Sequence, residues 1–264
     1  MGSFNNLLKQ IFPHQFLKQQ KLNVRKIRYA GKKYHCPVCK SNIKLWKPLG
    51  YDLPVITEKQ IVGGGKRLAQ CPVCDSSDRI RLLYLFLKNR TKVYSDKIKL
   101  LHIAPEPPLE FIFKHQKNID YLTTDMNPAM VMEQMDITNI QYPENSFDAI
   151  ICNHVLEHIP NDFKAMSELF RVLKPGGWAI LQVPFSKISD KTFEDPKVTS
   201  PEDRERIFGQ TDHVRIYGKD YADRLKKAGF EVEEYKWTED TDLNNPNNRL
   251  GLNEDEVVFY CLKK

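Results

Sequence analysis

From Lys97 onward, the sequence alternates between short apolar runs and segments whose apolar residues recur at helical spacing. We expect strands at residues 98–103, 121–124, 131–137, 147–152, 178–185, 230–237 and 256–262. Helical spacing marks residues 109–116, 163–173 and 221–228, and the second of these leads into Lys174-Pro175-Gly176-Gly177, a typical helix stop. This alternation predicts an α/β fold with a mainly parallel sheet covered by helices on both faces.

A second feature is a repeated cysteine pair, because the sequence C-P-V-C occurs at residues 36–39 and again at 71–74. Each pair can present two thiolates to one metal ion, and two pairs complete the tetrahedron that Zn²⁺ prefers. Two disulfides are disfavoured in a reducing compartment, and a thioredoxin-type redox site needs one such pair rather than two matched copies. We therefore expect Cys36, Cys39, Cys71 and Cys74 to hold a structural Zn²⁺.

Charge is distributed unevenly along the chain. Residues 1–97 contain 20 Lys and Arg against 5 Asp and Glu, whereas the remaining residues contain 20 against 29. The basic part could face an acidic partner such as RNA, or it could offset the negative charge of a zinc–thiolate cluster. No window approaches 18 consecutive apolar residues and no secretory signal is recognisable, so we expect a cytoplasmic protein without a membrane span.

These patterns predict three parts of the chain. Residues 1–34 read as a basic amphipathic helix and linker, with apolar residues at helical spacing between positions 4 and 12. Residues 35–96 form the zinc-binding module, which includes a helix capped by the Asp75-Ser76-Ser77-Asp78 segment. Residues 97–264 form the α/β domain, where Cys152 and Cys261 lie in apolar strands and are expected in the core.

Motifs in the α/β domain resemble those of a known family. The segment DAIICNHVLEH at 148–158 is followed by LFRVLKPGG at 169–177 and by HVRIY at 213–217. In this order and spacing they are similar to the motifs of class I S-adenosylmethionine-dependent methyltransferases, particularly the type 11 group. The resemblance covers about residues 98–264. It implies a Rossmann-like seven-stranded methyltransferase sheet with S-adenosylmethionine bound beyond the carboxyl ends of its strands.

The loop after the first strand departs from the family pattern, which is an acid followed by G-x-G-x-G. Here His102 replaces the acid, and Ala104, Glu106 and Pro108 replace the glycines. A Cβ at such positions narrows the space through which the backbone approaches a ligand. The cofactor pocket has then either lost its ability to bind or binds in an atypical way. In the second case, Glu106 approaches the methionine ammonium as a substitute acid. We expect an intact but atypical pocket that includes His102, Ala104 and Glu106.

The other cofactor positions implied by the resemblance follow the later strands. Asp125, with its neighbour Met126, matches the acid that accepts both ribose hydroxyls, and a carboxylate has lone pairs for two such donors. Asp136 and the backbone of Ile137 match the position that reads the adenine amino group. Asn153 matches a position that lines the methionine part of the cofactor.

Two histidines are candidate catalytic groups, because an oxygen or nitrogen acceptor calls for a base with a pKa near neutral. They are His154, at the mouth of the fourth strand, and His213, after the fifth. Residues 154–158 also fit H-x-x-E-H, an inverted zinc-protease signature. That chemistry requires a sustained helix and a third carboxylate ligand, whereas Pro160 follows closely, so we do not expect catalytic zinc there.

Three functions are compatible with these features. The leading hypothesis is a methyltransferase that modifies an O or N atom of a small metabolite. The second is an RNA base methyltransferase that uses the basic zinc module, although few aromatic residues interleave its basic ones. The third is a non-catalytic zinc-bearing binding protein on a degenerate scaffold, suggested by the missing glycines. The polar segment 186–209 is expected to be a lid or binding segment.

Overall fold

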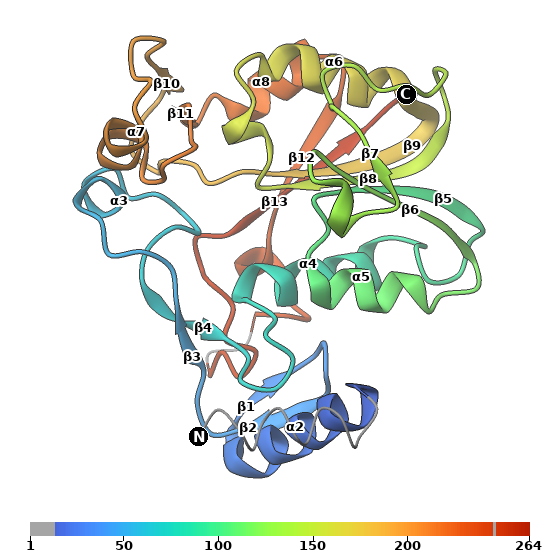
Figure 1. Cartoon of the computed structure of the whole chain (residues 1–264), viewed down its shortest axis with the longest axis vertical. Coiled ribbons are helices and arrows are strands. Elements are labelled where there is room, and N and C mark those ends of the chain that lie inside the picture. The colour runs from blue at the N-terminus through green and yellow to red at the C-terminus, as the bar shows by residue number, and fades with distance from the viewer. Residues whose placement is uncertain (1–13, 245–246) are drawn as a thin grey trace.

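The computed structural model describes residues 14–244 and 247–264. A central sheet lies between two layers of helices, and a smaller module built from the N-terminal part of the chain lies beyond one of these layers (Figure 1). The apolar positions 4–12 that predicted an amphipathic helix lie outside the described residues. Within the described part of the chain, no helix is both long and apolar enough to cross a membrane.

The sheet has seven strands in the order β12-β13-β9-β8-β5-β6-β7, so the predicted seven-stranded, mainly parallel sheet is confirmed. Its strands are β5 (Ile98–Ile103), β6 (Ile119–Asp125), β7 (Glu133–Gln134), β8 (Phe147–Asn153), β9 (Leu173–Gln182), β12 (Glu231–Lys236) and β13 (Val257–Leu262). Only β13 runs antiparallel to its neighbours β9 and β12. The chain moves outward from β5 through β6 to one edge and returns to β8 on the other side. The direction of winding therefore reverses between β5 and β8, where open α/β sheets bind their ligands.

Helices cover both faces of the sheet, and its central strand β8 is accordingly buried on both sides. On one face lie α6 (Asp162–Val172) and α8 (Tyr221–Lys227), and on the other lie α4 (Asp78–Arg90) and α5 (Pro107–Lys114). Alternate residues of β8 enter different cores: Ile150 and Cys152 pack in the first, whereas Ala149 and Ile151 pack in the second. Cys152 and Cys261 are both fully buried, as predicted.

Two elements differ from the sequence-based expectation. The third strand, expected over residues 131–137, is only the two-residue β7, because the side chain of Asp136 accepts hydrogen bonds from the backbone and hydroxyl of Thr138 and turns the chain. The helix stop at residues 174–177 lies inside β9, which begins directly after α6. There Gly177 passes so close to the carbonyl of Asp148 that an added Cβ would lie 2.8 Å from its oxygen.

The N-terminal module consists of small elements. These are α2 (His14–Tyr29), β1 (Ala30–Cys36), β2 (Ser41–Ile43), β3 (Lys47–Leu49), α3 (Pro54–Glu58) and β4 (Arg67–Gln70), with β1 paired to β2 and β3 to β4. Helix α4 follows the second cysteine pair and is capped by Ser77, which accepts from Ile80 N. Its apolar residues pack in the same core as Leu100 of β5 and Val258 of β13. The helix expected within the zinc module therefore also covers the sheet.

The segment after β9 forms β10 (Phe193–Glu194), α7 (Pro201–Phe208) and β11 (Arg215–Ile216). Phe208 and Ile216 form a small buried cluster with Val55 and Ile56 of α3. This cluster joins the segment to the module, as the neighbouring α3 and α7 in Figure 1 show. Among the described residues there are also three short 3₁₀ turns: η1 (Pro128–Met130), η2 (Leu156–His158) and η3 (Trp237–Glu239).

Candidate functional site

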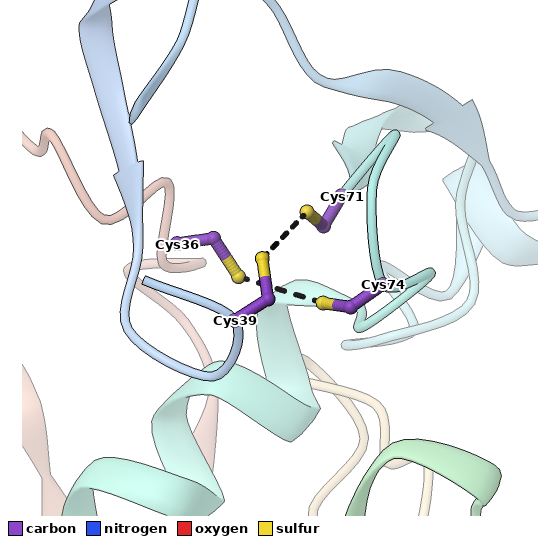
Figure 2. A group of neighbouring side chains, drawn as sticks. All are labelled: Cys36, Cys39, Cys71 and Cys74. Carbon is purple, nitrogen blue, oxygen red and sulfur yellow. Dashed lines mark hydrogen bonds between the residues drawn. The ribbon is translucent and has the colours of Figure 1, made fainter. Parts of the chain in front are cut away.

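The four predicted zinc ligands converge in the module (Figure 2). The Sγ atoms of Cys36 and Cys74 are 3.7 Å apart, those of Cys39 and Cys71 are 3.8 Å apart, and all four lie within 4.8 Å of one another. None of the four forms a disulfide. A tetrahedron with Zn–S bonds of about 2.3 Å has S–S edges of about 3.8 Å, so the arrangement fits Zn²⁺.

Polar groups surround this cysteine cluster. The hydroxyl of Ser76 lies 3.1 Å from Cys74 Sγ and 3.4 Å from Cys36 Sγ. Arg81 of α4 is fully buried beside the cluster and donates to the backbone carbonyls of Ser76, Ala69, Leu250 and Gly251. Its guanidinium thereby places a positive charge near the thiolates and ties the module to the loop before β13.

Three predicted cofactor residues meet at the carboxyl ends of β5 and β8. Glu106 Oε2 lies 2.9 Å from His102 Nε2, and Glu106 Oε1 accepts a 2.9 Å hydrogen bond from the side-chain amide of Asn153. The His102 ring is fully buried, and its Nδ1 is 2.9 Å from the hydroxyl of Tyr121. Burial raises the pKa of Tyr121 well above its usual value, so its hydroxyl keeps its proton and can donate to Nδ1. His102 then donates from Nε2 to Glu106.

The loop between β5 and α5 lacks glycine, yet its backbone adopts a conformation that glycine favours. Ala104 has φ of +47°, in the left-handed region that favours glycine, and its N–H donates to the carbonyl of Thr124. Glu106 is the N-cap residue of α5, and Pro107 and Pro108 occupy the first turn, where a missing N–H costs no helical hydrogen bond. The Glu106 side chain does not cap the helix, which leaves its carboxylate for His102 and Asn153.

The remaining predicted cofactor residues lie at the end of β6 and beside it. Asp125 ends β6 and accepts from Asn127 N, and the following Met126 side chain is 61% exposed. The backbone of Met135 donates to the carbonyl of Asp125, which brings the exposed Asp136 and the buried Ile137 next to this strand end. The structure therefore places the predicted ribose and adenine residues next to one another.

A cavity of about 570 Å³ lies where the module, the end of β8 and the segment after β9 meet. Such a volume is typical of small-molecule sites. Residues from all three regions line it, among them Gly50, Tyr51, Gly63, Gly64 and Arg79 from the module, His154, Glu157 and His158 after β8, and Phe208, Gln210 and His213 after β9. The end of the polar segment that was expected to be a lid thus forms part of its wall.

Both candidate catalytic histidines line this cavity, but the geometry restricts what His154 can do. Arg79 Nη1 lies 3.2 Å from His154 Nδ1, and a guanidinium can only donate, so Nδ1 is the acceptor. Burial, followed by the charge of Arg79, lowers the pKa of His154 well below its usual value. The neutral ring therefore carries its proton on Nε2. In this arrangement His154 can donate a hydrogen bond to an acceptor molecule, but it can act as a base only if Arg79 moves away.

His213 lies with Glu157 and His158 on another part of the cavity wall. The His158 and His213 rings are 4.7 Å apart at an interplanar angle of 80°. Burial, reinforced by neighbouring His158, lowers the pKa of His213 to about 4, so this ring is neutral at pH 7. Burial also raises the pKa of Glu157 to about 8, and its Oε2 has no hydrogen-bond partner. The H-x-x-E-H segment is a single 3₁₀ turn rather than a sustained helix, as expected.

Sequence reasoning did not identify Arg79 or the Gly63–Gly64 loop as part of a site. Arg79 is 75 residues from His154 along the chain, and no local sequence pattern predicts a contact over that separation. The backbone of Gly63 and Gly64 lines the cavity. Gly63 has φ of +80°, and an added Cβ would lie 3.1 Å from Arg79 Nη1. Glycine is the residue suited to this position.

Comparisons with known proteins agree with the fold and motifs. The family model described as a methyltransferase domain matches residues 66–235. A ubiquinone/menaquinone biosynthesis C-methyltransferase UbiE of Brucella canis is 32% identical over 111 residues, which are 37% of this chain and 41% of the relative. The UbiE protein of Hydrogenovibrio crunogenus is 33% identical over 72 residues, 27% of this chain and 24% of the relative. The chain thus matches less than half the length of these curated relatives.

Solved structures with similar folds share little sequence. A methyltransferase from Mesorhizobium loti is 11% identical, with a TM-score of 0.49 over 71% of this chain and 99% of that one. A 1,6-didemethyltoxoflavin-N1-methyltransferase from Burkholderia thailandensis is 13% identical, with a TM-score of 0.49 over 72% of this chain and 80% of that one.

Proposed function

The chain belongs to the methyltransferase domain family, and on this premise we propose that it transfers a methyl group from S-adenosylmethionine to an O or N atom of a small metabolite. The observation that carries the proposal is the Glu106 carboxylate, which His102 and Asn153 hold at the reversal point between β5 and β8. There it can receive the ammonium group of the cofactor, in place of the acid and glycines that other members of the family use.

The residues at this reversal point fit the cofactor. Asn153 Oδ1 is buried and has no hydrogen-bond partner, so it is free to accept from the same ammonium group. Asp125 would accept from the ribose hydroxyls, and Asp136 with the backbone of Ile137 would bind the adenine amino group. Met126, which follows Asp125, and Met130 of η1 are 61% and 69% exposed, and thioether side chains suit contact with an aromatic base.

When bound, S-adenosylmethionine supplies a methyl group on a sulfonium: the S–CH₃ bond breaks, its electron pair returns to sulfur, and a lone pair of the acceptor forms the new bond. The protein's contribution is to orient the two molecules and exclude water. His154 directly follows Asn153 and lies on the cavity wall, so the cavity is the natural acceptor site. Its volume of about 570 Å³ suits a metabolite better than an RNA strand.

We further propose that the four-cysteine cluster holds a structural Zn²⁺. The module contributes one wall of the acceptor cavity, and α4 connects the second cysteine pair directly to the sheet. A metal ion that fixes Cys71 and Cys74 also fixes the start of α4, from which Arg79 reaches His154. The zinc would thus support the acceptor site without contacting the reacting atoms.

Labelled S-adenosylmethionine tests the proposal. The wild-type chain should bind it and transfer its methyl label to the low-molecular-mass fraction of a cell extract. Asp125→Asn should lose at least about 10-fold in cofactor affinity, because it removes a charge-assisted acceptor. Asp120→Asn, an exposed change on the same strand, is the matched control and should bind like wild type. Label that enters RNA, or no binding at millimolar cofactor by folded protein, would overturn the proposal.

A further inference from the structure

Glu157, His158 and His213 form a cluster that the proposed methyl transfer does not by itself use. One nitrogen or carboxylate oxygen of each residue lies within 4.8 Å of those of the other two. Glu157 and His158 come from η2, directly after β8, and His213 comes from the segment that leads into β11. Two imidazoles and one carboxylate are a donor set that binds divalent transition metals and leaves other coordination positions open. This set contains His213 in place of His154, so it differs from the H-x-x-E-H arrangement of zinc proteases and needs no sustained helix.

A second observation points to a missing ligand. The Glu157 side chain is 2% exposed, yet its Oε2 has no hydrogen-bond partner. A buried carboxyl oxygen without a partner is costly unless a cation or donor that binds there satisfies it. The other carboxyl oxygen, Oε1, lies 3.5 Å from His154 Nδ1, which already accepts from Arg79. The Asp212 carboxylate lies 3.1 Å from His158 Nδ1, and metal-bound histidines commonly have such a carboxylate neighbour.

Backbone contacts fix the positions of the three residues. The fully buried Arg215 donates to the carbonyls of Leu156, Ile159 and Pro160. These hydrogen bonds fix the η2 turn and the residues that follow it. The N–H of Val214 donates to the carbonyl of Glu157, so the residue after His213 is tied directly to the turn. The cluster is therefore held by rigid local structure, as a metal site requires.

We propose that Glu157, His158 and His213 bind a divalent transition-metal ion that coordinates a hydroxyl group of the acceptor in the cavity. The coordination of an acceptor rests on the proposed function, whereas metal binding alone does not. A metal ion lowers the pKa of a coordinated hydroxyl. The hydroxyl proton passes to water, and the oxygen keeps the electron pair with which it attacks the methyl carbon. This assigns oxygen as the acceptor atom and removes the need for His154 to act as a base.

Cobalt binding tests the site directly. The full chain, with Zn²⁺ in its four-cysteine cluster, is titrated with Co²⁺ alone and followed by calorimetry and visible d–d absorption. Glu157→Gln and His213→Gln remove one ligand each, and His115→Gln, an exposed histidine at the end of α5, is the matched control. We expect wild type and His115→Gln to bind a single Co²⁺, and the two cluster variants to bind it at least about 10-fold more weakly.

Two outcomes would overturn the metal site: wild type without a d–d band, or cluster variants that bind Co²⁺ as tightly as His115→Gln. Co²⁺ must also shift the ring-proton NMR signals of two histidines in the wild-type chain, which tests the site without any substitution. S-adenosylmethionine binding is measured on the same samples. Cofactor binding without Co²⁺ binding refutes the metal site alone, and Co²⁺ binding without cofactor binding refutes the proposed function alone.

Discussion

Glu106, at the start of α5, accepts a 2.9 Å hydrogen bond from the side-chain amide of Asn153, at the end of β8. This bond spans the point where the winding of the sheet reverses, which is where ligands of such sheets bind. In the family pattern, a glycine occupies the position of Glu106. Here a carboxylate fills that space, and His102 and Asn153 fix its direction. The structure thus holds a carboxylate at the reversal point, and its contact with the ammonium group of the cofactor is what we propose.

Arg81 should be a major source of stability. Arg81→Met removes donors from four backbone carbonyls and the guanidinium that stacks 3.8 Å above the Trp46 ring. We expect the free energy of unfolding to fall by at least about 3 kcal/mol, because buried carbonyls lose their partners. Urea denaturation followed by tryptophan fluorescence measures this change.

Arg90→Met on the same helix is the control for Arg81. Arg90 is half exposed and 3.7 Å from Glu233, so its loss should cost less than about 1 kcal/mol. Equal effects of the two substitutions would show that Arg81 does not connect the module to the loop before β13.

Glu256 should make stability depend on pH. Burial raises the pKa of this carboxyl to about 7 from an ordinary value of 4.5, so the folded chain holds a proton that the unfolded chain releases between these values. The contribution of this raised pKa to the free energy of unfolding is complete below pH 4.5 and is lost as pH rises through 7. Glu256→Gln should therefore be more stable than wild type at pH 8, by about 3 kcal/mol at most.

Thermal unfolding between pH 5 and pH 8 tests this prediction. The wild-type free energy of unfolding should fall relative to that of Glu256→Gln as pH rises. Glu233→Gln, on the neighbouring strand β12 and half exposed, is the control and should follow wild type. Parallel curves for wild type and Glu256→Gln would contradict the assignment.

The zinc proposal predicts a loss of metal and of structure together. Cys71→Ser should lower the zinc content by one ion per chain and weaken the start of α4, because the two cysteine pairs share a single tetrahedron. Elemental analysis and hydrogen exchange at residues 76–82 measure the two effects. Cys261→Ala, in the core far from the cluster in sequence, should keep its zinc. Unchanged zinc in Cys71→Ser would refute the four-cysteine site.

Much of the fold could be predicted because strands buried on both faces, such as β8 and β13, appear as near-continuous apolar runs. β5, β6, β8, β12 and β13 all lie within two residues of their predicted bounds. The edge strand β7 could not be placed, because a two-residue strand leaves no periodic pattern. The start of β9 was missed because Pro175 and the glycines read as a helix stop, whereas here they accompany an irregular pairing with β8.

The site was predictable only where its residues belong to local motifs. Glu106 and Asn153 lie in recognisable segments, and the structure brings them together. The contact of Arg79 with His154 depends on how the module packs against the sheet, and this packing cannot be predicted from the spacing of residues along the chain. The meeting of Glu157 with His213 likewise depends on Arg215, which holds the η2 turn through three backbone carbonyls.

Calorimetry with S-adenosylmethionine on zinc-loaded protein shows whether Glu106 binds the cofactor, with Glu106→Ala compared against Glu110→Ala. Glu110 lies on the same helix in an ion pair with Lys114 and serves as the matched control. We expect micromolar binding by wild type and Glu110→Ala, and binding at least about 10-fold weaker by Glu106→Ala, because a charge-assisted contact to the ammonium is lost. Equal affinity of Glu106→Ala and wild type, or no heat from folded wild type at millimolar cofactor, would contradict this expectation.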